Sequence, residues 1–193
     1  MSTTPPAVPQ PVAPQEIYGV FCGQIDQASV QRIFQSMSTA TNPNLSVTHV
    51  HLLFQTSGGI VGDGVALHNF FKAYPLPLTI YNVGSVMSIG TIAYLGAKRR
   101  LTSAHALFQI HRSTMTTQNA LVADLKGRIQ SLTLDDSRTE SILKEYLTLS
   151  SKMWSQLKSG ADVSFSGEDA VNIGLATEIG GFAPPTAKQV YYI

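Results

Sequence analysis

The sequence predicts an α/β fold in which repeated β-α-β units build a mostly parallel sheet. Apolar runs rich in β-branched residues, typical of buried strands, alternate along the chain with segments whose apolar residues recur at helical spacing. Small residues and glycines follow two of the expected strands, at 56–59 and 84–88, and allow a sharp turn into the next helix. This alternation implies parallel strands joined by right-handed crossovers.

The first half of the chain supplies three strand–helix pairs. Its predicted strands are 17–22, 47–55 and 78–81. Asp26 caps the first predicted helix, which ends before the turn signal at 41–44. The second helix ends before Pro75, and the third, made of small apolar residues, begins after Ser88.

The second half combines short strands with longer helices. Short strands are expected at 101–102, 106–111 and 176–179. The polar segment 112–119 is interpreted as a loop or an exposed strand. Apolar residues from Leu121 to Tyr146 predict a long helical region, either one helix or two helices joined near Asp135-Asp136. Glycines end the two later helices, at Gly160 and Gly174.

The chain is expected to form one main domain between two short terminal segments. Residues 1–16 contain five prolines and predict a flexible, proline-rich arm, because this composition cannot bury a core. Residues 17–180 form the domain, which is large enough for a substantial core. Residues 181–193 form a tail whose apolar side chains are expected to dock on the body or on a neighbouring subunit.

Composition excludes several classes of function. The net charge is +1 with interspersed signs, which argues against nucleic-acid binding. The single cysteine, Cys22, excludes an intrachain disulfide and a cysteine-based zinc site, and its apolar neighbours predict a buried strand residue. The stretch 73–97 has no charged residue, but Pro75 and Pro77 lie within it, so it is not expected to span a membrane. The N-terminus lacks the features of a secretory signal, so a cytoplasmic protein is expected.

Ser88 stands where the third strand turns into its helix. A helix N-terminus has free N–H groups and the positive end of the helix dipole, so it favours an anion nearby. A hydroxyl that attacks a carbonyl group generates such an anion. Strand, tight turn, serine and buried helix therefore follow the logic of a nucleophile elbow, although the pattern is not G-x-S-x-G. The alternative is that Ser88 only caps or packs the helix.

A second strand-to-helix turn is formed by Thr56-Ser57-Gly58-Gly59. Glycines here allow a substrate to approach the backbone and expose N–H groups toward it. A phosphate-binding loop is the competing interpretation. The sequence contains neither a G-x-x-x-x-G-K-[ST] nor a G-x-G-x-x-G motif, so nucleotide binding is not expected.

Three histidines lie on predicted strands. His111 ends its strand, at the rim where sites of α/β folds form. His49 and His51 lie on the same side of another strand and form a conceivable metal pair. No third ligand is near them in the sequence, so they are interpreted as structural, and neither a metal site nor a cofactor is predicted.

Taken together, these pieces resemble the Clp peptidase family (ClpP) over about 17–180. The similar segments are the turn Phe54-Gln55-Thr56-Ser57-Gly58-Gly59, the nucleophile turn Gly84-Ser85-Val86-Met87-Ser88-Ile89-Gly90, the strand end Phe108-Gln109-Ile110-His111 and the stretch 162–175. Four such motifs in the right order and at similar spacing are specific. The resemblance implies a ClpP/crotonase-like fold whose long helical region forms the handle.

The resemblance also assigns roles to individual residues. Ser88 would be the nucleophile, His111 the general base and Asp162 the group that orients the imidazole. Asp135 or Asp136 would be distant alternatives to Asp162, whereas Asp169 is interpreted as a helix cap. The backbone N–H groups of Gly59 and Ile89 would form the oxyanion hole.

Such a site implies a serine endopeptidase that acts through an acyl-enzyme on peptides or unfolded polypeptides. The resemblance further implies a homo-oligomeric ring that encloses a chamber and an AAA+ ATPase as partner, with no role for nucleic acid or a membrane. Where the family has Gln-Pro and a glycine-rich strand after the histidine, this chain has Arg112-Ser113-Thr114-Met115-Thr116-Thr117.

Three other functions remain open from the sequence. A crotonase-type enzyme shares the fold and the oxyanion hole but acts on acyl-CoA esters. A signal-peptide-peptidase-like enzyme with a Ser/Lys pair shares the strand-turn motifs. A non-catalytic or regulatory ClpP-like subunit would act within a mixed assembly.

Overall fold

A six-stranded sheet in which every neighbouring pair is parallel forms the centre of the computed structural model, which describes residues 13–119 and 121–193. Its strand order is β8-β5-β3-β2-β1-β9. The strands are β1 (Gln15–Cys22), β2 (Val47–Gln55), β3 (Leu78–Asn82), β5 (Arg99–Thr102), β8 (Glu178–Ile179) and β9 (Val190–Tyr192). The predicted α/β fold with a mostly parallel sheet is confirmed.

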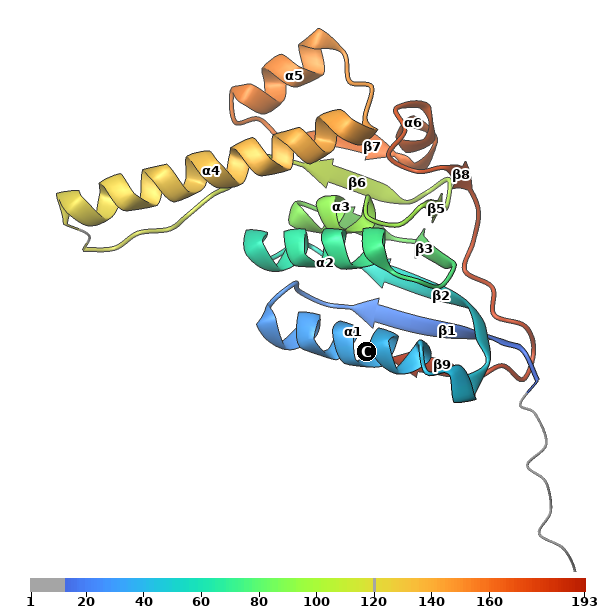
Figure 1. Cartoon of the computed structure of the whole chain (residues 1–193). Helices are drawn as coiled ribbons and strands as arrows, with labels where there is room; N and C mark the ends of the chain where they lie inside the picture. The colour runs from blue at the N-terminus through green and yellow to red at the C-terminus, as the bar shows by residue number, and fades with distance from the viewer. Residues whose placement is uncertain (1–12, 120) are drawn as a thin grey trace, which may run out of the picture.

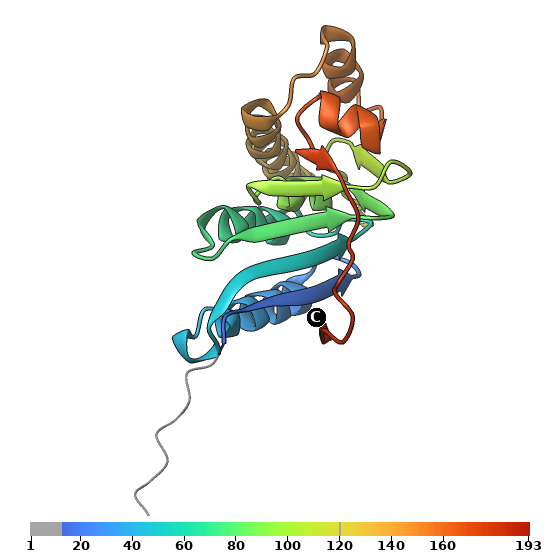
Figure 2. The same ribbon diagram turned by 90° about the vertical axis from the view of Figure 1, so that its right-hand side faces the viewer.

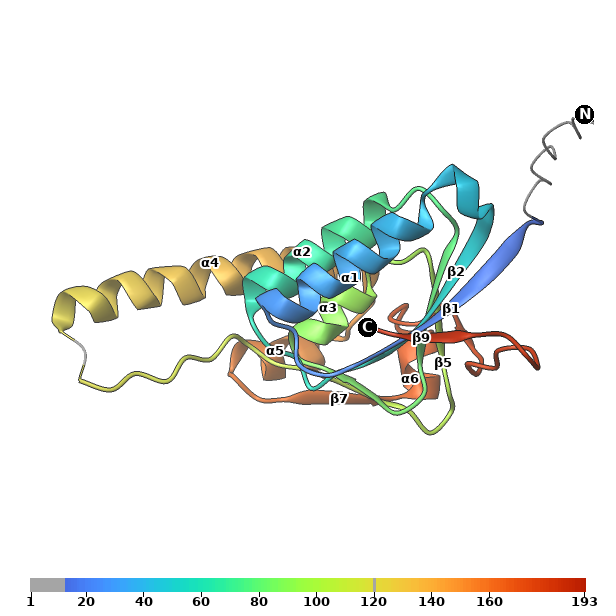
Figure 3. The same cartoon turned by 90° about the horizontal axis from the view of Figure 1, so that it is seen from below.

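Helices α1 (Gln27–Ala40), α2 (Val61–Ala73) and α3 (Ile89–Tyr94) lie side by side against one face of this sheet, as Figures 1 and 3 show. Each helix crosses over between two parallel strands, which is the arrangement that the alternating sequence predicts. Asp26 caps α1, since its side chain accepts a hydrogen bond of 2.8 Å from the N–H of Ser29. A short 3₁₀ turn, η1 (Pro43–Leu45), leads into β2.

The core lies between these helices and the sheet. Alternate side chains of a strand point to opposite faces, so the fully buried Leu52, Phe54 and Ile80 meet Ile33 and Leu67 from the helices. Burial of such large apolar side chains supplies about 1.5–3 kcal/mol each. This packing fixes where the strands end, and the turns that follow β2 and β3 therefore have fixed positions.

A second sheet of three strands lies next to the first. It consists of β4 (Ser85–Met87), β6 (Leu107–Ile110) and β7 (Val163–Ser166) in the order β4-β6-β7. β4 and β6 are parallel, whereas β6 and β7 are antiparallel. Because β4 runs directly into α3, this sheet positions the start of that helix.

The remaining helices are α4 (Val122–Tyr146), α5 (Ser151–Lys158) and α6 (Gly167–Asn172). The long α4 is continuous across Asp135 and Asp136, so the one-helix alternative holds. Its N-terminal half projects from the body (Figure 1), and this half exposes several large apolar side chains. These side chains are Leu121, just before the helix, Val122, Leu125, Ile129 and Leu134.

The C-terminal segment returns across the sheet. From β8 it crosses the other strands to β9, which pairs with β1 and forms the opposite edge of the sheet, as the dark red trace in Figure 2 shows. Phe182 contacts the rings of Tyr18 and Tyr81 on the way, at centroid distances of 5.9 and 5.4 Å. In this structure, the predicted tail therefore docks on the body.

Some details differ from the sequence-based expectations. β1 begins at Gln15, two residues before the predicted start, because Gln15 and Glu16, although polar, pair with Val47 and His49 at the start of β2. Cys22 is exposed, contrary to the prediction, since it is the last residue of β1 and lies beyond the covered part of the strand. The segment 112–119 contains no strand. A proline-rich arm was predicted for residues 1–16, and residues 1–12 of it lie outside the described residues.

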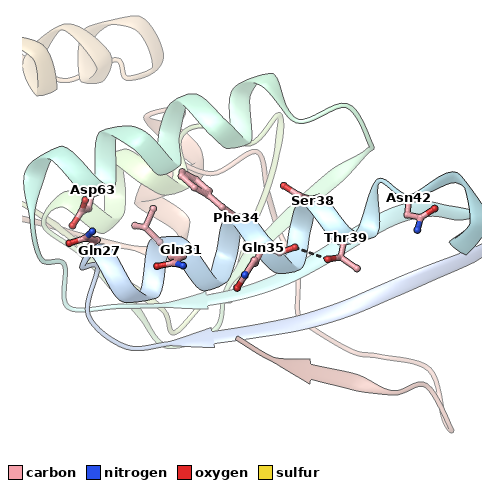
Figure 4. A pocket seen from close by; sticks show the side chains of 9 residues that line it. Gln27, Gln31, Phe34, Gln35, Ser38, Thr39, Asn42 and Asp63 are labelled. Atoms are coloured by element: carbon pink, nitrogen blue, oxygen red, sulfur yellow. Dashed lines mark hydrogen bonds between the residues drawn. The ribbon is translucent and has the colours of Figure 1, made fainter.

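A broad hollow of about 810 Å³ lies along the exposed side of α1. Figure 4 shows that Phe34 lies among uncharged polar side chains there, with Asp63 of α2 at one end. Among helices within 13–119 and 121–193, none has the length and apolar character needed to cross a lipid bilayer.

Candidate active site

Ser88 lies between β4 and α3, as the N-cap residue of that helix. Its backbone has φ = 55° and ψ = −132°, a conformation that costs a non-glycine residue about 1–3 kcal/mol. An N-cap serine normally bonds the helix backbone with its side chain, but the Ser88 hydroxyl makes no such bond. The turn therefore has an unfavourable backbone conformation, and it leaves the Ser88 hydroxyl without a hydrogen bond to the helix backbone.

Two hydrogen-bonding contacts to β6 hold this turn in place. The backbone N–H of Ser88 donates to the carbonyl of Gln109 at 2.7 Å. The hydroxyl of Thr91, one turn into α3, lies 3.2 Å from the carbonyl oxygens of both Val86 and Gln109. These contacts bind the Ser88 turn to the strand that leads to His111.

The turn formed by Gly58 and Gly59 lies directly against Ser88. The φ angles of the two glycines are +105° and +155°, which L-residues with a side chain rarely adopt. A Cβ atom at Gly58 would lie 2.6 Å from the Cβ of Ser88, and one at Gly59 would lie 2.0 Å from the carbonyl oxygen of Ile25. The backbone of this turn approaches so closely only because both residues are glycine.

Ser88, Gly59, Ile89 and His111 line one small cleft of about 80 Å³. The segment 112–114 and α4 form its other wall. Within the part of the chain that the structure describes, the N–H groups of Gly59 and Ile89 donate no hydrogen bond to another protein group. Two free N–H groups that line one cleft with a free hydroxyl are able to donate hydrogen bonds to an oxyanion formed beside it.

His111 follows the last residue of β6, and its imidazole is oriented by the main chain. Its Nδ1 lies 2.6 Å from the carbonyl oxygen of Arg112. A carbonyl oxygen only accepts, so Nδ1 carries the hydrogen and, in the neutral ring, Nε2 carries the lone pair. This is the tautomer that a general base needs. Among the described residues, no hydrogen bond joins Ser88 Oγ to His111.

Asp162 does not line the cleft. Its carboxylate is exposed and accepts a hydrogen bond of 3.2 Å from the side-chain amide of Gln109. β6 and β7 pair Ile110 with Val163, so the same antiparallel register, extended by one residue, sets Asp162 opposite His111. Residues opposite one another share a face with Cβ atoms about 5 Å apart. The backbone thus brings Asp162 near His111, while its side chain is turned to Gln109.

Arg112 connects the segment 112–114 to α4. Its guanidinium donates to Asp136 at 2.7 Å and to Glu140 at 3.3 Å, and the N–H of Ser113 donates to Asp136 at 2.8 Å. Burial opposes ionisation of Asp136, but the hydrogen bond from Ser113 and the Arg112 guanidinium outweigh it and hold the pKa of Asp136 below its ordinary value. The backbone that orients His111 is therefore anchored to the long helix.

The other carboxylates considered from the sequence are engaged elsewhere. Asp169 is part of the capping box of α6 with Ser166. Asp135 pairs with Arg138 at 2.7 Å, and Asp136 pairs with Arg112. Sequence reasoning overlooked Gln109 and Arg112. Gln109 lies two residues before His111 and hence on the same strand face, which is the one signal that pointed to it.

Possible metal ligands gather away from this cleft. In the described residues, the ligating atoms of Glu16, His49 and His51 lie within 4.8 Å of one another, on β1 and β2.

Comparison with known proteins agrees with the architecture of the fold. The family model for Clp protease matches residues 15–181, which is most of the chain. A search of curated proteins returned no significant match. Proteins of the Clp protease type are peptidases that typically assemble into oligomeric rings. By its sequence and its fold, this chain belongs to the Clp protease family.

Proposed function

We propose that the protein is a serine endopeptidase in which Ser88, His111 and Asp162 form the catalytic triad. The observation that carries this proposal is the strained turn at Ser88, with φ = 55° and a hydroxyl that caps nothing. A turn of this kind has no benefit for the helix it begins, whereas it presents a nucleophile beside two free N–H groups.

The geometry supports acyl transfer in two steps. Ser88 Oγ attacks the peptide carbonyl carbon while His111 Nε2 accepts the hydroxyl proton, and the N–H groups of Gly59 and Ile89 stabilise the oxyanion. The imidazolium then protonates the leaving amine, which departs and leaves an acyl-enzyme. Water attacks the ester with His111 as base, and the proton returns to Ser88 as the acid product leaves.

Asp162 would stabilise the imidazolium after its side chain turns from Gln109 to His111. The strand register already sets the two residues opposite one another, so this change needs a side-chain rotation and no strand movement. In the resting arrangement, the Arg112 carbonyl holds the ring in the same tautomer.

The proposed substrates are peptides or unfolded polypeptides, cleaved inside the chamber of a homo-oligomeric ring. The apolar side chains on the projecting half of α4 support self-association, because Val122 and Ile129 are 70% and 64% exposed there. An AAA+ ATPase partner and a cytoplasmic location complete the proposal.

The proposal is tested by measuring peptide hydrolysis by two variants, Ser88→Ala and a control at another serine of the same cleft. Ser113 lines the cleft and donates its backbone N–H to Asp136, a bond that alanine keeps, so Ser113→Ala serves as the control. We expect kcat to fall by at least about 10³-fold in Ser88→Ala and to stay within about threefold in Ser113→Ala. Unchanged hydrolysis by a folded Ser88→Ala protein would refute the proposal.

A second candidate is a regulatory subunit without activity of its own. It is favoured by the His111–Arg112 contact, since the imidazole already has a main-chain partner and Asp162 bonds Gln109 instead. A subunit of this kind would hydrolyse no peptide alone and would change the activity of a second ClpP-like chain on mixing. Activity of the isolated chain that depends on Ser88 excludes it.

A further inference from the structure

Three aromatic rings are stacked on the face of the main sheet that α1, α2 and α3 do not cover. Tyr18 of β1 lies against His51 of β2 at 4.5 Å and 6°, and His51 lies against His49 at 4.2 Å and 10°. We propose that Glu16, His49 and His51 form a binding site for one divalent transition-metal ion, with Zn²⁺ as the best fit. This site is independent of the Ser88 cleft.

Strand pairing brings the three ligands together. His49 and His51 are two residues apart on β2 and therefore share a face. The parallel register of β1 and β2 sets Glu16 opposite His49 and Tyr18 opposite His51. One ligating atom from each of the three side chains lies within 4.8 Å of the other two. The third ligand that the sequence lacked near the histidines comes from the neighbouring strand.

His51 is the most fixed of the three. Its residue is 8% exposed, and its Nδ1 lies 2.8 Å from the hydroxyl of Tyr81. Its Nε2 is buried, has no hydrogen-bond partner among the described residues, and lies 3.4 Å from Oε2 of Glu16. A metal-binding histidine usually has one ring nitrogen fixed by an outer partner and the other directed at the ion. A buried ring nitrogen without a partner otherwise carries a cost that metal binding would remove.

Glu16 is also held in position. The Tyr18 hydroxyl donates to Oε2 of Glu16 at 3.1 Å. The carboxylate is half exposed, so it remains open to an ion that arrives from solvent. Tyr18 thus orients one ligand by a hydrogen bond and stacks on another.

His49 has to move for the ion to bind. Its Nε2 lies 2.8 Å from the hydroxyl of Thr79, and its ring is almost parallel to that of His51. Lone pairs in two parallel rings do not converge on one point. A turn of the His49 ring about χ2 directs a ring nitrogen toward His51 Nε2 and Glu16, and the partial exposure of His49 leaves room for it.

The ligand set selects the class of metal. Two imidazole nitrogens and one carboxylate oxygen suit Zn²⁺, with a water molecule in the fourth position. Ca²⁺ and Mg²⁺ prefer sets made of oxygens. The ion would join β1 to β2 near their starts, whereas the Gly58 and Ser88 turns follow strand ends.

Zn²⁺ titration of the chelator-treated full chain, followed by calorimetry, tests the proposal. We expect the wild type to bind one Zn²⁺ with a dissociation constant in the micromolar range or lower. Glu16→Gln and His49→Ala should each weaken this binding by at least about 10-fold. His105→Ala removes an exposed histidine of the β5–β6 turn and should leave the affinity unchanged.

The experiment distinguishes a loss of metal binding from a loss of folding. Glu16 is exposed, so Glu16→Gln leaves the core intact, and a normal melting curve verifies that this variant folds. The proposal is overturned if the wild type binds no Zn²⁺ at 100 μM, or if Glu16→Gln and His49→Ala bind as tightly as the wild type. Excess Mg²⁺ that displaces Zn²⁺ would also overturn it.

Discussion

The Nδ1 atom of His111 lies 2.6 Å from the carbonyl oxygen of Arg112, so a main-chain group orients this imidazole. Arg112 is in turn held to α4 by Asp136 and Glu140. A carbonyl oxygen fixes the tautomer as a carboxylate does, but it carries no full charge to stabilise the imidazolium that forms during catalysis. Asp162 would therefore add the negative charge that the Arg112 carbonyl lacks.

Asp162→Asn should lower kcat on peptide substrates roughly 10²- to 10⁴-fold. The amide that replaces the carboxylate has no negative charge to stabilise the His111 imidazolium. Steady-state kinetics at neutral pH measure the effect. A kcat equal to that of the wild type would mean that the Arg112 carbonyl alone supports the histidine.

Gln109→Ala is the matched variant for Asp162. Its amide is the observed partner of the carboxylate, at 3.2 Å, and competes with His111 for it. Removal of that amide frees Asp162 to turn, so kcat should be equal to or higher than that of the wild type. A decrease comparable to that of Asp162→Asn would show that Gln109 supports the site instead of competing in it.

Gly58→Ala should lower kcat by about 10²-fold, because displacement of a reacting group by about 1 Å has an effect of this size. The new Cβ would lie 2.6 Å from the Cβ of Ser88 at a residue with φ = +105°. We also expect a loss of more than about 1 kcal/mol in the free energy of unfolding. Chemical denaturation and peptide hydrolysis measure the two effects.

Gly127→Ala provides the contrast to Gly58→Ala. Gly127 lies within α4, and its added Cβ would meet no atom within 4 Å. Alanine in a helix interior is favoured over glycine by about 0.5–1 kcal/mol, so this variant should be more stable than the wild type and equally active. Reduced activity would instead link the projecting helix to catalysis.

His68 should make the stability depend on pH. Burial lowers the pKa of His68, against the opposing effect of the Ile92 carbonyl, which lies 3.0 Å from Nδ1. In the unfolded chain its pKa is about 6.5, so below this pH the unfolded state binds more protons than the folded state. The free energy of unfolding should therefore fall as the pH decreases from 7.5 to 5.5.

His68→Gln isolates this contribution. Glutamine keeps an N–H donor for the Ile92 carbonyl but does not titrate. Urea unfolding at pH 7.5 and 5.5 should give a smaller decrease for His68→Gln than for the wild type. His49 and His51 remain in both proteins, so their titration cancels in the comparison. Equal decreases would contradict the assignment to His68.

Local patterns in the sequence predicted one turn of the candidate site better than the other. The pair Gly58-Gly59 follows the buried strand β2 as expected, whereas the turn expected at 84–88 contains the short strand β4 (Ser85–Met87) of the second sheet, which leads to Ser88. His111 follows the last residue of β6, as the apolar run before it indicated. The positions of these residues depend on backbone geometry, which short stretches of sequence specify.

Contacts between distant segments were not predictable in this way. Nothing near Val190 indicates that the last residues pair with β1, and nothing near Glu16 indicates that it lies opposite His49. The hydrogen bonds of His111 and Asp162 depend on side-chain rotation after the strands have paired. Such contacts follow from register and packing, which a local pattern does not contain.

Fluorophosphonate labelling, with the modified residue located by peptide mass spectrometry, tests the central claim most directly. We predict one label per chain, on Ser88, and its loss in His111→Ala but not in Ser113→Ala. This result would establish a serine activated by His111. A folded protein that takes up no label, or takes it up at another residue, would contradict the assignment of Ser88 as the nucleophile.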